Sequence, residues 1–195
     1  MFDTLDDVKT EIFQRLDDGA KRRKSPLHTP VVGTADADQR VMVLREFDAE
    51  TRTLRFHTDA RSPKCADIGE GTPVGVLFYD PEAKTQIRAR GTGRIERSGP
   101  IADAAWAAST NFAKRCYLAE DAPGNLSGEG TSGLPAWAEG INPTDEQILP
   151  ARENFAVLLV ELDRLDWLYL ANTGHRRAVF EASEGDELSG RWVVP

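Results

Sequence analysis

The sequence contains few metal-binding side chains, which narrows its possible chemistry. Cys65 and Cys116 are the only cysteines among 195 residues, and there are only three histidines. No CxxC pair or Cys/His cluster occurs, so neither a disulfide framework nor a metal site is expected.

The chain also lacks long apolar runs and an excess of positive charge. No stretch of 18 apolar residues occurs, and acidic residues occupy the N-terminus. We therefore expect no membrane span and no secretory signal, and we predict a cytoplasmic protein. Because the net charge is -8, nucleic-acid binding is not expected. The length and composition predict a single globular domain over residues 1–195.

The N-terminal 20 residues predict an amphipathic helix, which we place at residues 4–19. Apolar residues recur on one stripe of this helix. Thr4 and Asp7 resemble a capping box, and Gly19 is a plausible end.

Most of the remaining pattern is typical of short strands, so the predicted class is mainly β, a β-barrel with flanking helices. Strands are expected near residues 30–35, 40–47, 53–59, 74–79, 85–96, 155–165, 166–171, 175–182 and 191–195. The strand over 40–47 is apolar on both faces, so helices or a partner subunit should cover its outside. Gly91 and Gly93 indicate a bulge or a barrel corner.

Residues 102–118 are alanine-rich and predict a helix. Residues 119–150 contain five glycines and four prolines and predict a long loop. Such a loop inside a compact domain is usually functional or mobile, and both a substrate lid and a surface excursion over a neighbouring subunit are open.

The junction RFHTDARSPKCADI, residues 55–68, carries more cations than helix capping requires. Ser62 is a favoured N-cap, and Pro63 suits the first helical position. Lys64 places a cation in the first turn, where the helix dipole favours an anion. With donors from Arg61 and Thr58, a bound phosphate or carboxylate would reverse that penalty. A plain capped helix with an exposed lysine is the alternative.

Neighbouring strands offer further polar candidates. Arg40 and Arg45 are five residues apart and point to opposite faces of a regular strand, so they meet one anion only through a bulge or a strand end. Gln86 begins the strand TQIRARG, where its amide can contact a polar ring edge.

Taken together, QRVMVLREF, RFHTDARSPKCADI, TQIRARG and DWLYLANTGHRRAVF resemble the pyridoxamine 5'-phosphate oxidase family of FMN-binding split β-barrels. The resemblance implies a homodimer with FMN in a groove between subunits. It implies cofactor contacts from the following residues: Arg40, Arg45, His57, Thr58, Arg61, Ser62, Lys64, Gln86, Trp167 and Arg177. His175 is implied on the substrate side.

Three departures from the family pattern are visible in the sequence. Pro63 replaces the arginine of the SRK triplet that holds the FMN phosphate, and Arg61 is a candidate replacement. His57 stands where the family has a tyrosine. Thr173 occupies the arginine position of the RxH pair that holds the B6 substrate, so the resemblance does not extend to that substrate.

The sequence therefore predicts an FMN-dependent oxidoreductase that acts on an unidentified small molecule. No nucleophile–base pair stands out, in keeping with chemistry supplied by a cofactor that takes a hydride at N5 and passes electrons to an acceptor. The alternatives are a flavin carrier or sensor without turnover, and a split barrel that uses deazaflavin or haem.

Overall fold

The computed structural model describes residues 3–183 and 187–195, which cluster into two compact units. The first unit comprises residues 3–56, 71–94 and 159–195 apart from 184–186. The second comprises residues 57–70 and 95–158. The expectation of one domain over 1–195 stays a prediction.

Helix α1, Leu5–Lys21, belongs to the first unit and begins with the predicted capping box. The Asp7 amide donates to Thr4 Oγ1 over 3.1 Å, and the Thr4 amide donates to Asp7 Oδ2 over 3.2 Å. The predicted end at Gly19 is wrong, because the helix continues for two more residues. Gly19 is buried against the 3-10 turn η1, Pro26–His28, where an added Cβ would lie 2.9 Å from the Leu27 carbonyl oxygen.

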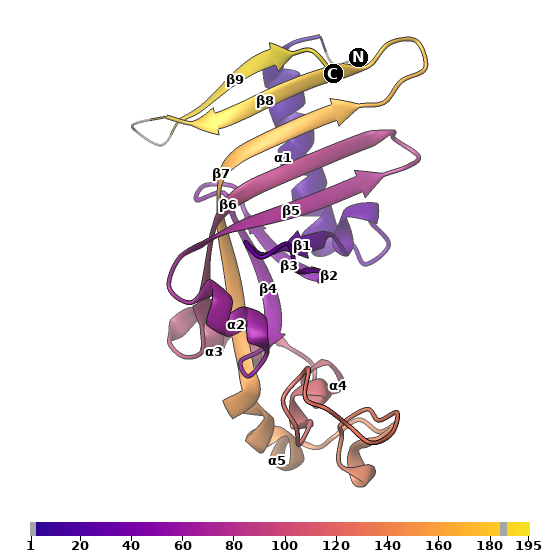
Figure 1. Cartoon of the computed structure of the whole chain (residues 1–195), viewed down its shortest axis with the longest axis vertical. Coiled ribbons are helices and arrows are strands. Elements are labelled where there is room, and N and C mark those ends of the chain that lie inside the picture. The colour runs from indigo at the N-terminus through magenta and orange to yellow at the C-terminus, as the bar shows by residue number, and fades with distance from the viewer. Residues whose placement is uncertain (1–2, 184–186) are drawn as a thin grey trace. The chain divides into compact units, whose positions relative to one another are not determined.

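Nine strands form one antiparallel sheet, which confirms the predicted mainly β class with flanking helices (Figure 1). The strands are β1 Val31–Gly33, β2 Gln39–Val41, β3 Leu44–Asp48, β4 Thr53–Asp59, β5 Thr72–Asp80, β6 Thr85–Glu96, β7 Phe155–Tyr169, β8 Arg176–Ala182 and β9 Leu188–Val193. Their order is β2-β1-β5-β6-β7-β4-β3, and β8 and β9 extend the sheet from β7. No pairing joins β2 to β3 within the described chain, so the sheet is open, as in a split barrel.

Two strand predictions need correction. The strand predicted over 40–47 is interrupted at Met42 and Val43, and its halves become β2 and β3 at the two ends of the strand order. The two strands predicted over 155–171 are instead the single strand β7. Met42 and Leu44 are buried, but the Val41 side chain on the other face is 64% exposed. That face is not covered by this chain's own described residues.

Gly91 permits a close backbone approach between strands. The register of β5 and β6 is continuous from Thr72–Gly93 to Asp80–Thr85, so the predicted bulge is absent from this pair. A Cβ added at Gly91 would lie 1.9 Å from the Glu161 carbonyl oxygen of β7, a distance that no side chain tolerates.

The second unit is mainly helical, with α2 Pro63–Ile68, α3 Pro100–Ala108, α4 Asn111–Lys114, η2 Arg115–Leu118, η3 Ala136–Ala138, α5 Asp145–Ile148 and η4 Leu149–Asn154. The helix predicted over 102–118 is interrupted because Thr110 starts a new helix, where its hydroxyl accepts from the Ala113 amide over 3.2 Å. The Phe155 ring forms the core of this unit, with ring centroids of His57, Trp106 and Tyr117 at 5.0, 5.3 and 5.2 Å.

No helix within residues 3–183 or 187–195 is both long enough and apolar enough to span a bilayer.

Candidate functional site

Residues 58–64, which we call the phosphate turn, link β4 to α2 in the second unit. As predicted, Ser62 is the N-cap of α2 and Pro63 is its first residue. Gly69 ends the helix with a φ of +53°. The Ser62 hydroxyl does not cap the helix, however. It donates instead to the Asp59 carbonyl oxygen over 2.7 Å, which turns the hydroxyl toward the loop.

Three donors converge at this turn. Lys64 Nζ donates to Ser62 Oγ over 2.9 Å, and Ser62 Oγ lies 3.4 Å from Thr58 Oγ1. Thr58 and Ser62 are 5% and 4% exposed. Two hydroxyls and an ammonium group suit a phosphate once the Ser62 hydroxyl rotates away from the Asp59 carbonyl oxygen, so these side chains fit the group that the sequence implied.

Arg61 is bound within the chain on both edges of its guanidinium. Nε and Nη2 donate to the two carboxylate oxygens of Asp59 over 3.0 and 2.8 Å. Nη2 and Nη1 also donate to the carbonyl oxygens of Ala119 and Glu120 over 2.9 and 3.2 Å. The hydrogen bonds with Asp59 raise the pKa of Arg61 above its ordinary value. A direct contact with phosphate stays a prediction for Arg61.

His57 precedes the phosphate turn on β4 and is half-buried. Its ring packs edge-on against Phe155, with centroids 5.0 Å apart and an interplanar angle of 75°. Packing against an aromatic core fixes the orientation of this imidazole. Whether it also touches a ligand stays a prediction.

Arg40 and Arg45 lie on different strands of the first unit, and the break between β2 and β3 removes the face argument made for a regular strand. Arg40 is half-buried, forms an ion pair with Asp38 and donates to Thr34 Oγ1 over 3.3 Å. Arg45 is exposed at a register shift between Leu44 and Glu46 of β3. A shared anion for Arg40 and Arg45 stays a prediction.

Gln86 lies on an exposed face of the sheet. Its register partner is Tyr79, and the neighbouring pair on the same face is Leu77 with Arg88. Leu77 and Tyr79 are 39% and 49% exposed. Gln86 therefore borders an apolar surface, where its amide remains available to a ligand or a partner.

Asp166 orients Arg177, and sequence reasoning missed it. The Asp166 side chain is 5% exposed, and its two oxygens accept from Arg177 Nε and Nη2 over 2.9 and 2.7 Å and from Arg88. Burial raises the pKa of Asp166, but the hydrogen bonds from Arg177 and Arg88 outweigh burial and hold this pKa below its ordinary value. The same pairing raises the pKa of Arg177. The only sequence signal was an acid inside an apolar strand.

Trp167 is fully buried, and its ring stacks on Tyr169 with centroids 6.1 Å apart. This position gives Trp167 a packing role in the sheet. Its flavin contact stays a prediction.

His175 is exposed and lines an open cavity of about 400 Å³ in the first unit, together with Arg177 and Trp192. Arg176, which also lines the cavity, forms an ion pair with Asp3 over 2.8 Å. The structure thus brings His175 and Arg177 to one cavity, and their contacts with substrate and cofactor stay predictions.

Lys114, in the second unit, is a second residue that sequence reasoning missed. It is 8% exposed, and its Nζ lies 4.8 Å from the centroid of the Trp106 ring. Within the described chain, no ion pair or side-chain hydrogen bond is found for this ammonium group. A lysine in an alanine-rich helix gave no signal of burial.

The open, mainly β sheet with flanking helices is that of a split β-barrel. Residues 11–97 match the family model for "Pyridoxamine 5'-phosphate oxidase, FMN-binding domain". This match confirms the resemblance to the pyridoxamine 5'-phosphate oxidase family and supports FMN as the cofactor.

Solved structures share this fold. A pyridoxamine 5'-phosphate oxidase-related, FMN-binding protein from Nostoc punctiforme matches with a TM-score of 0.72 and 22% identity, over 96% of this chain and 97% of that chain. PhzG from Burkholderia lata, in complex with tetrahydrophenazine-1-carboxylic acid, matches with a TM-score of 0.68 and 16% identity, over 96% and 90%. A general stress FMN/FAD-binding protein from Xanthomonas citri matches with a TM-score of 0.53 and 13% identity, over 86% and 92%. No curated protein matches the sequence.

Proposed function

We propose that this protein is an FMN-dependent oxidoreductase that acts on a small molecule. The observation that carries the proposal is the convergence of Thr58, Ser62 and Lys64 in the phosphate turn. The family match supports FMN as the group bound there. When bound, FMN supplies two-electron redox chemistry, and the protein contributes position and electrostatics.

The proposed roles divide among the predicted residues. The hydroxyls of Thr58 and Ser62 and the ammonium of Lys64 hold the phosphate. Contacts to the rest of the cofactor are proposed for Arg40, Arg45, His57, Gln86, Trp167 and Arg177. His175 is proposed on the substrate side, where its cavity also contains Arg177.

We further propose that the active form is a homodimer. Val41, Leu77 and Tyr79 are exposed apolar side chains, and the pairing of Val31 with both Val41 and Leu77 places two of them in one row across the sheet. Exposed apolar groups that gather on one face mark interaction surfaces. Because Gln86 borders this surface, a second copy would bring it close to the subunit interface.

An acidic substrate is the chemistry that Lys114 favours. Lys114 is 8% exposed, and within the described chain no carboxylate pairs with its ammonium group, so that group is available to an anion. A carboxylate or phosphate on the substrate would provide the missing charge, and the Trp106 ring would pack beside it.

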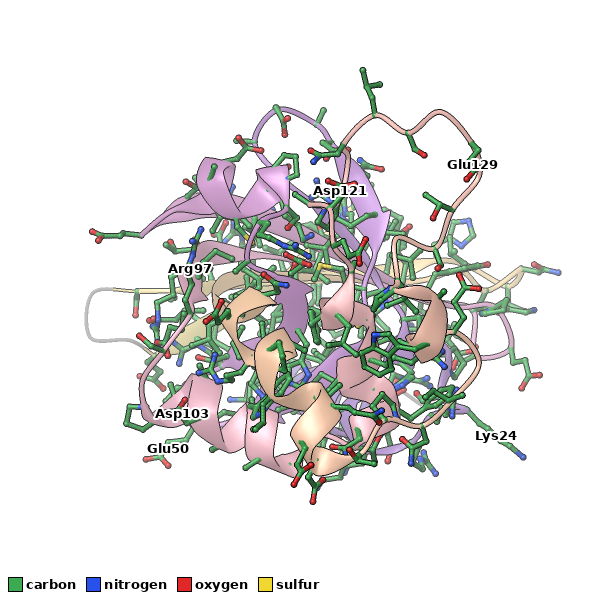
Figure 2. All side chains as sticks on the ribbon, turned by 90° about the horizontal axis from the view of Figure 1, so that it is seen from below. Lys24, Glu50, Arg97, Asp103, Asp121 and Glu129 are labelled. Atoms are coloured by element: carbon green, nitrogen blue, oxygen red, sulfur yellow. The ribbon has the colours of Figure 1, made fainter. Side chains whose placement is uncertain are left out.

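The test is FMN binding by the purified protein with Lys64→Ala as the variant, followed by flavin fluorescence. We expect the variant to lose about 1.5–3 kcal/mol of FMN affinity, the contribution of a hydrogen bond to a charged group, and to keep its affinity for riboflavin, which lacks the phosphate. Lys24→Ala is the control, since Lys24 is exposed in the first unit and projects away from the ribbon (Figure 2).

Unchanged FMN affinity in Lys64→Ala would refute the phosphate site. FMN binding without reduction of the bound flavin by reduced nicotinamides or small organic donors would instead favour a carrier or sensor. If the protein does not bind FMN but binds deazaflavin or haem, the proposal is wrong and the protein is a split barrel that uses one of those cofactors.

A further inference from the structure

Arg61 joins the phosphate turn to the glycine-rich loop, residues 119–150. Both segments belong to the second unit. One edge of the guanidinium holds the Asp59 carboxylate, and the other edge holds the Ala119 and Glu120 carbonyl oxygens. Of its five N–H groups, these contacts use four, which leaves little capacity for an external anion.

Asp59 is fixed by the same turn that carries the phosphate donors. Its carboxylate accepts from the Arg61 amide over 2.9 Å. Its carbonyl oxygen accepts from the Ser62 hydroxyl over 2.7 Å and from the Cys65 thiol over 3.2 Å. A displacement of Asp59 therefore moves the hydroxyl that contacts Lys64.

The start of the glycine-rich loop, which Arg61 holds, is joined to the middle of the loop and lies near the turn. The Glu120 amide donates to the Gly133 carbonyl oxygen over 2.9 Å, which ties the start of the loop to its middle. Gly124 lies beside Pro63, where an added Cβ would be 3.8 Å from Pro63 Cγ. The proline that replaces a family arginine thus lies near Gly124 of the loop.

We propose that Arg61 is a positioning residue that couples the order of the glycine-rich loop to FMN binding at the phosphate turn. This inference rests on the proposed function, because it concerns the same site. In this role Arg61 acts through Asp59 and the loop and not through a contact with the phosphate. It holds Asp59 and the start of the loop in one arrangement, which keeps the donors of the turn in place for the cofactor. Such coupling is reciprocal. Bound FMN should therefore protect the loop from proteolysis, and release of the loop from Arg61 should lower the affinity for FMN.

The first experiment measures FMN affinity in Arg61→Ala, Arg61→Lys, Asp59→Asn and the Asp59→Asn/Arg61→Ala double variant. We expect each single variant to bind FMN about 10-fold more weakly, within the usual range for coupled sites. The double variant should lose no more than the single ones, because all of them break one network. Lysine keeps the charge but cannot bridge a carboxylate and two carbonyls, so Arg61→Lys should resemble Arg61→Ala.

The second experiment follows cleavage of the loop by a glutamate-specific protease. Glu120 is held by Arg61, whereas Glu129 lies farther along the loop and is exposed (Figure 2). In the protein without FMN, Arg61→Ala should speed cleavage after Glu120 several-fold relative to cleavage after Glu129. Added FMN should slow cleavage after Glu120 in the unaltered protein and have less effect in the variant.

Arg115→Ala is the matched control, because Arg115 donates to the Ile141 carbonyl oxygen in the same loop over 2.8 Å but does not touch the turn. Its FMN affinity should stay within about twofold of the unaltered protein. If Arg61→Lys binds FMN with full affinity, the positive charge at position 61 contacts the phosphate directly and the proposal is overturned. Unchanged cleavage after Glu120 in Arg61→Ala would also overturn it. If the unaltered protein binds no FMN, the proposed function and the coupling both fail, while cleavage without FMN still decides whether Arg61 holds the loop.

Discussion

Asp166 allows a quantitative prediction for the free energy of unfolding. Its carboxylate is nearly buried and pairs with two arginines that are both partly exposed to solvent. The side chain of Asp166 is 5% exposed, against 26% for Arg177 and 52% for Arg88. In Asp166→Asn, the amide keeps the shape but loses the charge and turns one donor toward an arginine. Removing one partner of a buried pair destabilises by about 3–5 kcal/mol. Hydration of the two partly exposed arginines offsets some of this destabilisation. We therefore expect Asp166→Asn to lower the free energy of unfolding by about 2–3 kcal/mol.

The assay is urea unfolding of the unaltered protein and Asp166→Asn at a series of pH values. Because the pKa of Asp166 is lowered in the folded state, its contribution to stability is complete above the unfolded-state pKa of about 3.9. The contribution is lost as the pH falls through the still lower folded-state pKa. The difference between the two proteins should therefore be full at pH 7 and shrink only below about pH 4.

Asp163→Asn is the control on the same strand. Asp163 pairs with Arg90 over 3.4 Å, and the two side chains are 50% and 61% exposed. Exposed pairs contribute about 0–1 kcal/mol, so this variant should differ little from the unaltered protein. Equal stability of Asp166→Asn and Asp163→Asn at pH 7 would refute the reasoning.

Two further variants test particular contacts. Gly91→Ala should prevent stable folding or lower the free energy of unfolding by more than about 4 kcal/mol, because its Cβ would overlap the Glu161 carbonyl oxygen; a soluble variant with an unchanged urea midpoint would contradict this. Lys114→Met should leave thermal stability unchanged or raise it by up to about 1 kcal/mol, since loss of the contact with Trp106 is offset by removal of a buried charge. A loss above about 2 kcal/mol would show that the chain itself satisfies this ammonium group.

Local signals in the sequence predicted much of the fold. The capping box at Thr4 and the helix start at Ser62 and Pro63 involve residues close together in the chain, and the structure has both. Two of the wrong predictions concern glycines whose role depends on a segment elsewhere in the chain. Gly19 does not end α1, because its neighbour is Leu27 of a later turn, and Gly91 faces a carbonyl group 70 residues away. A single sequence does not reveal which backbone passes close to a glycine.

The candidate site shows the same division. Thr58, Ser62 and Lys64 lie within seven residues, so their convergence follows from one strand-to-helix junction. The partners of Arg61 and Arg177 did not follow from the sequence. Arg61 reaches a loop 58 residues away, and Arg177 pairs with an acid on the neighbouring strand. A candidate cation is visible in sequence, whereas the carboxylate or carbonyl that already binds it depends on the fold.

Together, Pro63 and Arg61 change what the phosphate turn requires of the rest of the protein. The family pattern places an arginine at position 63, and the nearest substitute in this chain directs four N–H groups to Asp59 and the glycine-rich loop. Under the proposed function, Lys64 is then the one full positive charge that the turn offers to the phosphate, with two hydroxyls beside it. A phosphate held by fewer charges depends more on how rigidly its donors are placed. Under the same proposal, the contacts of Arg61 with the loop provide that rigidity, and the loop then contributes to cofactor binding.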